Sequence, residues 1–423
     1  MNINYKILKA GRVGIIQPMP QGSLAKTLEK QCSYEKQGKE FMPNPRFAMV
    51  KLYKINRGTF PWGLLKIITD VLEAWQKKSG DTYSVMWAFS HTEPNLEHLI
   101  LRPYQKNAIM ELIKNHGGIL AMPTGSGKTL TCIKYLEQMN KPALVIVHTR
   151  YLKRQWEGLV NKNVHVKTYQ SLKNLIHILP NYEIIVFDEV HHVAARTLYT
   201  IAMKLKDHIV IGLSATPYRE DGEDLKIKAA IGEIVYQIEL REIIKQGYLV
   251  DAEVKWINLE QMNFGREEQY AGIYSAYIVD NVGRNNAILR VPLELYKKNK
   301  ILILISQIDH GQKLFDVLNA RGEDVVFLHS KAKLESYDHR IIIATSILDE
   351  GIDLPDREVI VMGAGGKSSI KVTQRIGRVL RLYPGKAKAT IIDFIDRSKF
   401  LHNHYILRKE KYDEYGFAQE LLV

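Results

Sequence analysis

The chain has 423 residues, of which 46% are hydrophobic and 25% charged, which is enough material for two or three domains with buried cores. Lysine and arginine outnumber aspartate and glutamate, and 59 − 46 leaves a formal charge of +13 that favours a polyanionic partner. Its apolar runs have the length of strands, which argues against a membrane protein. Only two cysteines are present and the N-terminus lacks a signal-like apolar stretch, which argues against a disulfide-rich secreted protein. We therefore expect a cytoplasmic protein.

Residues 1–96 are predicted to form a small N-terminal α+β accessory domain. Residues 47–53 alternate in part like a strand, and residues 64–75 place apolar side chains on one side of a helix. We find no catalytic motif here, so by elimination the region is predicted to select the substrate. Trp62 is interpreted as a core residue rather than as a strand-separating wedge. A basic strand face for the phosphates of duplex or junction DNA is predicted from four side chains, Arg46, Lys51, Lys54 and Arg57.

Two series of short β-rich runs alternating with helical stretches follow. The first, in a domain predicted over 97–235, has apolar runs at 118–121, 143–147, 183–187 and 209–213. The second, in a domain predicted over 236–423, has runs at 301–306, 324–328, 340–344, 358–362 and 389–394. Such alternation is typical of parallel sheets with crossover helices. The predicted fold class is therefore α/β, with two successive parallel sheets.

Residues 122–129, with the sequence MPTGSGKT, follow a predicted strand and open a predicted helix. A glycine-rich turn in that context lets backbone N–H groups surround phosphates at the positive end of a helix. Lys128 is predicted to neutralise the β- and γ-phosphates, and Thr129 to ligate Mg²⁺. Met122 stands where the strict pattern has glycine. The predicted nucleotide-binding residues of this loop are Pro123, Thr124, Gly125, Ser126, Gly127, Lys128 and Thr129.

A second apolar strand ends in two acidic residues, Asp188 and Glu189. Asp188 is predicted to hold Mg²⁺, and Glu189 to orient and deprotonate an attacking water. The alternative is an ordinary acidic loop after a buried strand. The phosphate loop 60 residues upstream (188 − 128) favours the catalytic interpretation.

The segment Asp188-Glu-Val-His191 resembles the DExH box of superfamily 2 helicases, and residues 214–217 (SATP) resemble their motif III, which couples hydrolysis to movement. The resemblance implies RecA-like domains, ATP as the nucleotide and a catalytic role for His191. Residues 101–105 resemble the adenine-reading motif of these helicases, which implies that Arg102 and Gln105 contact the nucleotide. The alternative for Gln105 is an ordinary surface position on a helix.

The segment 374–381 (QRIGRVLR) places Arg378 and Arg381 on neighbouring turns of one helix. It is similar to motif VI of the same superfamily, which implies that both arginines contact the γ-phosphate and that Gln374 faces the DExH histidine. A basic helix on a phosphate backbone is the alternative. Residues 344–355 resemble motif V, which implies that Gly351 and Asp353 approach the nucleotide.

The resemblance also implies a nucleic-acid strand held by its phosphates, without reading of the bases. Each candidate residue has an ordinary surface role as its alternative. The candidates are Thr149, Arg150, Thr168, Gln170, Ser171, Ser306, Gln307, His329, Ser330 and Thr345.

Residues 212–221 and 242–250 are most similar to the branch of XPB-like and phage UvsW-type branch-migration helicases. This implies a DNA-dependent ATP hydrolase, a 3′ to 5′ DNA helicase or translocase that uses ATP and Mg²⁺ in a bacterial or phage-infected cell. It would act as a monomer on single-strand, forked or junction DNA in replication, recombination or repair, alongside other proteins of those pathways. Two alternatives stay open, an RNA helicase and a motor subunit of a larger complex that does not unwind alone.

Overall fold

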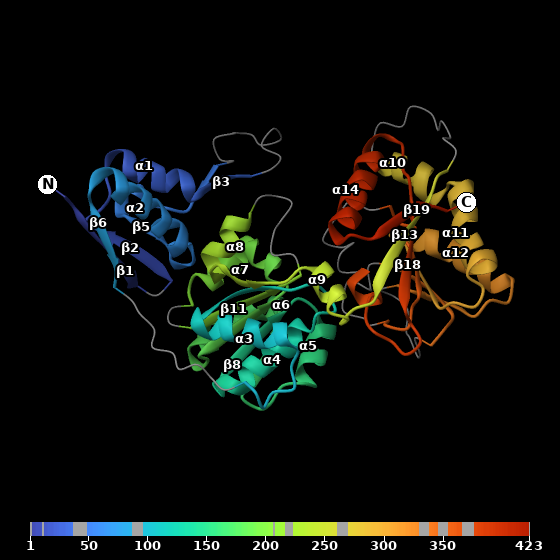
Figure 1. Cartoon of the computed structure of the whole chain (residues 1–423), viewed down its shortest axis with the longest axis horizontal. Coiled ribbons are helices and arrows are strands. Elements are labelled where there is room, and N and C mark those ends of the chain that lie inside the picture. Colours follow the sequence, from blue (N-terminus) through green and yellow to red (C-terminus); the bar gives the residue numbers. More distant parts are fainter. Residues whose placement is uncertain are drawn as a thin grey trace. The chain divides into compact units, whose positions relative to one another are not determined.

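The computed structural model describes residues 2–10, 12–36, 49–86, 96–205, 208–215, 223–259, 270–329, 338–345, 354–365 and 376–422. The chain divides into two units, Met1–Met122 with Gly127–Ile238, and Pro123–Ser126 with Glu239–Val423. The first unit holds a four-stranded, a two-stranded and a six-stranded sheet, and the second a seven-stranded one (Figure 1). Within the described residues, no helix is both long and apolar enough to cross a membrane.

The accessory domain, coloured blue in Figure 1, is a mixed four-stranded sheet packed against two helices. The strands, in the order β5-β2-β1-β6, are β5 (Thr59–Pro61), β2 (Val13–Gln17), β1 (Asn4–Ala10) and β6 (Thr82–Val85). The helices are α1 (Gly22–Gln31) and α2 (Leu65–Ser79), and β3 (Ser33–Glu35) pairs antiparallel with β4 (Met49–Lys51). The helix predicted over 64–75 is therefore confirmed. Trp62 is 7% exposed, which confirms it as a core residue.

The six-stranded sheet of the first unit is entirely parallel, in the order β12-β7-β11-β10-β8-β9. Its strands are β7 (Gly117–Ala121), β8 (Ala143–Val147), β9 (Val164–Thr168), β10 (Ile184–Asp188), β11 (Ile209–Ser214) and β12 (Ile234–Gln237). The sequence predicted the four that are buried along their whole length, as parallel strands covered on both faces are. It missed β9 and β12, because these edge strands are only partly buried and lack a continuous apolar run.

Helices connect these strands as crossovers, and Figure 1 shows α3, α4 and α5 beside the sheet. The helices are α3 (Pro103–Lys114), α4 (Lys128–Met139), α5 (Arg150–Glu157), α6 (Tyr169–Leu172), α7 (Arg196–Ala202) and α8 (Asp224–Ile231), with 3₁₀ segments η5 (Lys173–Asn181) and η6 (Val190–Ala194). Because the strands are parallel, the segments that follow β7, β10, β11, β8 and β9 all leave from one edge of the sheet.

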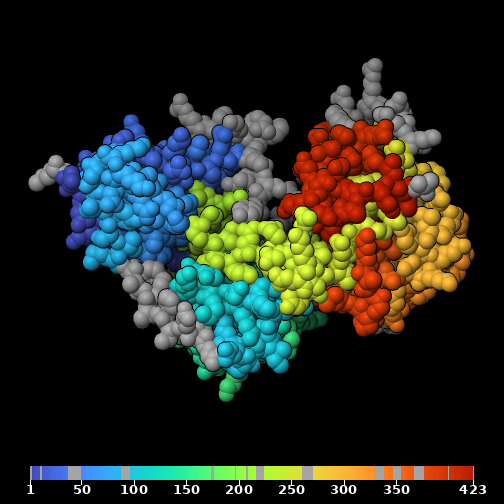
Figure 2. Space-filling model, in the orientation of Figure 1, coloured from blue at the N-terminus to red at the C-terminus, as the bar shows by residue number. Residues whose placement is uncertain are grey.

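The accessory domain packs on α8 of the first core. The Arg12 guanidinium, 8% exposed, donates to the carbonyls of Ala230 and, at 3.1 Å, Ile231, at the end of that helix. A Cβ added to Gly63 would lie 2.0 Å from the carbonyl oxygen of Lys228, so only glycine permits this approach. Ala229 belongs to the accessory domain's apolar core. Figure 2 shows the blue surface meeting the green to yellow-green surface that contains α8.

The seven-stranded sheet of the second unit is also entirely parallel, in the order β15-β16-β14-β17-β18-β13-β19. Its strands are β13 (Asp251–Ile257), β14 (Ile301–Leu304), β15 (Val325–Leu328), β16 (Ile341–Ala344), β17 (Val359–Val361), β18 (Lys388–Phe394) and β19 (Ala418–Leu421). Five were predicted. The sequence missed β13, whose side chains alternate between buried and partly exposed, and β19, an exposed edge strand.

The helices of the second unit are α9 (Leu240–Lys245), α10 (Tyr270–Tyr274), α11 (Val282–Arg290), α12 (Ile308–Ala320) and α14 (Lys399–Tyr415), with π-helical segments η7 (Ser275–Val279) and η8 (Val291–Leu295). The predicted α/β class, with two parallel sheets after a small mixed N-terminal sheet, is thus confirmed.

A buried charge network joins β18 to α14 and α11. Arg408 contacts Asp393 (Nε to Oδ2, 2.8 Å) and Asp396 (Nη2 to Oδ2, 3.0 Å). Arg284 contacts the other oxygen of Asp396 at 2.6 Å, and the Tyr412 hydroxyl donates to Asp393 at 2.8 Å. Burial alone would lower the pKa of Arg408, but the charges of Asp393 and Asp396 outweigh burial and raise it. Two arginines thus neutralise two aspartates inside this unit.

Candidate nucleotide and nucleic-acid site

The loop after β7 has the backbone shape that its glycines predict. Gly125 (φ +87°) and Gly127 (φ +84°) both adopt the left-handed conformation that side chains disfavour. A Cβ on Gly127 would also lie 2.5 Å from the Gln105 amide nitrogen. Helix α4 begins at Lys128, so the backbone N–H groups of its first turn point toward the loop. This strand, loop and helix have the backbone geometry that suits an anion.

Gln105 lies against that turn and is 3% exposed, so the alternative of a surface position is wrong. Its Oε1 accepts a hydrogen bond from the backbone N–H of Arg102 (3.0 Å), which caps the first turn of α3. The Arg102 guanidinium donates to the hydroxyl of Tyr104 at 2.9 Å. The side chain of Gln105 is therefore positioned beside the phosphate loop, and its contact with adenine stays a prediction.

Asp188 ends β10 and is 6% exposed. Its carboxylate accepts hydrogen bonds from the Trp156 indole (2.9 Å) and the Glu189 backbone N–H (3.1 Å). Burial, and then the charge of Glu189, raise the pKa of Asp188 to about 6, against the opposing effects of Trp156 and of nearby Lys128. The lysine of the phosphate loop and the acid of the second motif therefore belong to one electrostatic site.

The turn after Asp188 is held by aromatic side chains. Glu189 is a non-glycine residue with φ +52°, a conformation that occurs preferentially at functional sites. The hydroxyl of Tyr169, from α6, donates to the Asp188 carbonyl at 2.5 Å, and burial raises its pKa well above 10. His191 Nδ1 lies 3.4 Å from Glu189 Oε2.

The His192 ring is centred 4.2 Å from that of His191 and 5.0 Å from that of His148. Sequence reasoning missed His148, Trp156, Tyr169 and His192. His192 could have been predicted from the sequence, since it directly follows the DExH box. Trp156 and Tyr169 could not, because they lie 32 and 19 residues from Asp188 and no local pattern marks them.

The arginine segment of the second unit is helical over residues 376–379. Arg378 and Arg381 are both partly buried, but only Arg378 lies in the helix, because Arg381 forms a β-bridge with Leu249. The prediction that both arginines lie on neighbouring turns of one helix is therefore wrong. Lys386, 8% exposed, donates to the carbonyls of Val379 and Pro355, the second at 2.9 Å. Lys386 therefore joins the arginine segment to the last residue of motif V, a role that sequence reasoning missed.

The nucleic-acid candidates of the first unit lie at the ends of β8 and β9, which are neighbours in the sheet. Thr149 caps α5, its hydroxyl accepting from the Leu152 N–H at 3.1 Å. The Ser171 hydroxyl donates to the Thr168 carbonyl at 2.7 Å, and the Gln170 amide donates to the His148 carbonyl at 3.5 Å. The structure brings these residues together with Arg150, and shows that Thr149 and Ser171 also stabilise local turns.

The candidates of the second unit follow three adjacent strands, β15, β16 and β14. His329 follows β15, Thr345 follows β16, and Ser306 and Gln307 follow β14, with Gln307 preceding α12. The Thr345 N–H donates to the Leu328 carbonyl at 3.1 Å. These four residues therefore share one edge of the sheet. Other predicted residues lie outside the described part of the chain: Arg46, Ser330, Gly351, Asp353, Gln374, and Thr216 and Pro217 of motif III.

Comparison with known proteins agrees with this arrangement. Residues 98–163 and 158–219 match the family described as "Type III restriction enzyme, res subunit", and residues 284–383 match the "Helicase conserved C-terminal domain". The chain belongs to the superfamily 2 helicases. It is accordingly an ATP-dependent helicase or translocase, and therefore an ATP hydrolase, with two RecA-like domains in tandem.

The helicase is 26% identical over 344 residues to the "DNA 3'-5' translocase XPB2" of Sulfurisphaera tokodaii, covering 66% of this chain and 78% of that protein. It is 24% identical over 363 residues to the "ATP-dependent DNA helicase uvsW" of Enterobacteria phage T4, covering 72% of each. The structure of S. cerevisiae Dbp5 bound to RNA and ADP BeF3 has the same fold, with a TM-score of 0.54 at 17% identity over 75% of this chain and 89% of that one. The predicted resemblance to the XPB-like and UvsW-type helicases is confirmed.

Proposed function

We propose that this helicase is a DNA-dependent motor that translocates 3′ to 5′ and remodels forked or branched DNA in replication, recombination or repair. The choice of DNA and of this polarity is supported by the relatives described as a DNA 3'-5' translocase and a DNA helicase. The observation that carries the motor chemistry is the turn of buried Asp188 and half-buried Glu189. It lies close enough to Lys128 for the lysine charge to oppose the rise in the pKa of Asp188.

The residues present suit Mg²⁺ together with ATP. Asp188 is an almost fully buried carboxylate whose pKa burial raises to about 6, so a bound divalent cation would stabilise its ionised form. Asp188 and the hydroxyl of Thr129, in the first turn of α4, are the proposed ligands. Mg²⁺ would supply positive charge to the phosphate oxygens during hydrolysis.

Each remaining step belongs to side chains of the helicase. Lys128 and the glycine-rich turn bind the phosphates, and the Gln105 amide, fixed by the Arg102 N–H, contacts the base. Glu189 orients the water and accepts its proton, with His191 beside its carboxylate at 3.4 Å. Arg378 and Arg381 are proposed to stabilise the charge that develops on the γ-phosphate.

The proposal is tested by measuring ATP hydrolysis with single-strand, forked and four-way-junction DNA and with matched RNA. Stimulation by DNA together with fork or junction unwinding is the expected result. Equal rates with and without nucleic acid would contradict the motor mechanism. Preferential stimulation by RNA would favour an RNA helicase, and DNA stimulation without unwinding would favour a motor subunit of a larger complex.

The proposed site is tested by Lys128→Ala. We expect hydrolysis to be abolished, because the charge that compensates the phosphates is removed, while DNA binding without nucleotide is retained. Continued hydrolysis by this variant would refute the assignment of the phosphate loop.

A further inference from the structure

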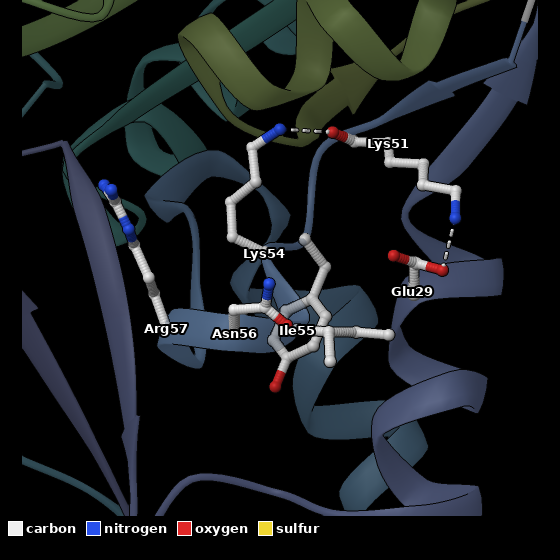
Figure 3. Close-up of a pocket in the computed structure, with 7 residues that line it drawn as sticks. Glu29, Lys51, Lys54, Ile55, Asn56 and Arg57 are labelled. Atoms are coloured by element: carbon white, nitrogen blue, oxygen red, sulfur yellow. Dashed lines mark hydrogen bonds and ion pairs between the residues drawn. The ribbon is translucent and has the colours of Figure 1, made fainter.

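The accessory domain carries a strongly basic, hollowed surface outside the two helicase sheets. One hollow of ≈ 500 Å³ is lined by Glu29, Lys51, Tyr53, Lys54, Ile55, Asn56 and Arg57 (Figure 3). A second of ≈ 280 Å³ shares Glu29 and Lys51 with it, and is lined further by Lys26, Lys30, Ser33, Tyr34, Glu35 and Met49. We call the two together the α1–β4 surface.

The charge of the α1–β4 surface is unbalanced. Among the described residues, five cationic side chains line it against two carboxylates. Lys51 contacts Glu29 at 2.7 Å, so one of the five is paired. Lys54 donates to the Lys51 carbonyl at 3.0 Å, a contact that leaves its charge in place. Figure 3 shows Arg57 standing apart from the Lys51–Glu29 pair, with no interaction drawn to it.

The cations are presented by short local elements rather than by one strand. Only Lys51 lies in a strand, β4, whereas Lys54 precedes the 3₁₀ turn η3 (Ile55–Arg57) and Arg57 ends it. The prediction of one basic strand face is therefore wrong for Lys54 and Arg57, which lie beyond β4, where Gly58 (φ +59°) turns the chain back toward β5. Lys26 and Lys30, four residues apart on α1, extend the surface along that helix.

The side chains of the α1–β4 surface suit the phosphates of a nucleic acid rather than its unstacked bases. Proteins that hold single strands offer exposed aromatic rings for stacking, but Tyr53 is 0% exposed and the partly buried Tyr34 donates its hydroxyl to Glu223 at 3.3 Å. Exposed lysine and arginine side chains, by contrast, displace counterions from a duplex backbone. Among the described residues that line it, the surface therefore offers charge without stacking platforms.

We propose that the α1–β4 surface binds the phosphate backbone of double-helical DNA, so that the accessory domain holds a duplex arm while the helicase cores handle the strand. The proposal rests on the proposed function only in taking DNA as the polymer. Because the accessory domain packs on α8 through Arg12 and Gly63, a duplex held there is held by the same unit that contains Lys128 and Asp188.

The test measures binding of a blunt, fluorescently labelled DNA duplex of about 20 base pairs to the full chain, without nucleotide, as a function of salt. Lys54→Ala/Arg57→Ala is expected to bind roughly 10-fold more weakly, with a slope of log K against log salt shallower by about 2, because two phosphate contacts are lost. Both side chains are exposed, so the fold is expected to persist, which a thermal melt checks.

The matched control is Lys77→Ala/Lys78→Ala, in the last turn of α2, which removes the same charge from exposed positions that line neither hollow. It is expected to bind as the unaltered chain does. Glu29→Gln, which removes a carboxylate shared by both hollows and releases Lys51, is expected to bind more tightly. Equal affinity and salt slope for the two double variants would overturn the proposal, as would a loss of RNA-duplex binding without loss of DNA-duplex binding.

A negative result for duplex binding by the α1–β4 surface is distinguishable from a negative result for the proposed motor function. Binding is measured without hydrolysis, so Lys128→Ala is expected to bind the duplex normally even though it cannot turn over ATP. An absence of DNA-stimulated hydrolysis would defeat the proposed motor and leave the duplex-binding comparison of the variants valid.

Discussion

Strands β10 and β18 have similar local sequences, an apolar run that ends at or near a buried aspartate, yet the two carboxylates meet different surroundings. At the end of β10, Asp188 accepts hydrogen bonds from an indole and a backbone N–H, lies beside Glu189, and has its pKa raised to about 6. In β18, Asp393 accepts from Arg408 and Tyr412, and Asp396 just beyond it pairs with both Arg408 and Arg284.

The difference separates a carboxylate available for chemistry from one committed to the fold. Asp393 and Asp396 are balanced by two fully buried guanidinium groups, and removing either partner would strand a charge in the core. Asp188 is dominated by desolvation and by a like charge, so an incoming cation would relieve it. An acidic strand end therefore indicates a functional site when its neighbours leave the charge incompletely balanced.

The most direct test of this difference is to neutralise Asp188 and Asp393 in separate variants. Asp188→Asn is expected to reduce ATP hydrolysis on the order of 10³-fold, because the proposed ligand of Mg²⁺ is lost, while the free energy of unfolding stays the same or rises slightly. Asp393→Asn is expected to lower the free energy of unfolding of the second unit by about 3–5 kcal/mol, because Arg408 loses its buried counter-charge.

Steady-state hydrolysis and urea denaturation of the full chain, measured on both variants, check these outcomes together. A strongly destabilised Asp188→Asn would show that this carboxylate is structural. A stable and inactive Asp393→Asn would show that the buried network is part of the catalytic machinery.

A smaller effect is expected from the partner that orients Asp188. Trp156→Phe removes the indole N–H at 2.9 Å and keeps most of the ring volume. Loss of a hydrogen bond that orients a metal ligand typically costs about 10- to 100-fold in metal affinity or activity. We expect a rise of that size in the Mg²⁺ concentration needed for half-maximal hydrolysis, measured by titration at saturating ATP. An unchanged Mg²⁺ requirement would mean that the hydrogen bond serves only packing.

The smallest predicted effect concerns the pH dependence of the second unit. His310 is fully buried, and its Nε2–H donates to Asn285 Oδ1 at 2.8 Å. Burial, and then the charges of Arg284 and Lys313, lower the pKa of His310 to about 4. Between pH 6.5 and pH 4 the unfolded chain therefore takes up a proton that the folded chain does not, so stability falls as the pH falls through this window.

By pH 5.5 this loss amounts to about 1 kcal/mol. Urea unfolding of the full chain at pH 8 and pH 5.5, compared with His310→Gln, isolates the contribution, since glutamine offers an N–H donor that does not titrate in this range. We expect the variant to lose about that much less stability on acidification. Equal losses in the two proteins would show that His310 titrates normally.

Some elements were predictable because their signal is local. Strands β7, β8, β10 and β11 are buried on both faces, so each is a continuous apolar run. Strands β9 and β13 were not, because their side chains alternate between buried and exposed, a pattern that short loops share. The same holds for site residues: Lys128 is identified by its own loop, whereas Trp156 is identified only by the aspartate 32 residues away that it contacts.

The sequence by itself determined the two parallel sheets and the order of the ATP-site motifs, because a glycine-rich turn between a strand and a helix and an acidic strand end are properties of neighbouring residues. Only the tertiary structure decided which of the two acidic strand ends has its charge neutralised by arginines. It also decided that the accessory domain packs on α8 through Arg12, whose partner carbonyls lie 218 and 219 residues away in the chain. Neutralisation and docking depend on contacts between residues far apart in the chain, which folding brings together and local patterns do not record.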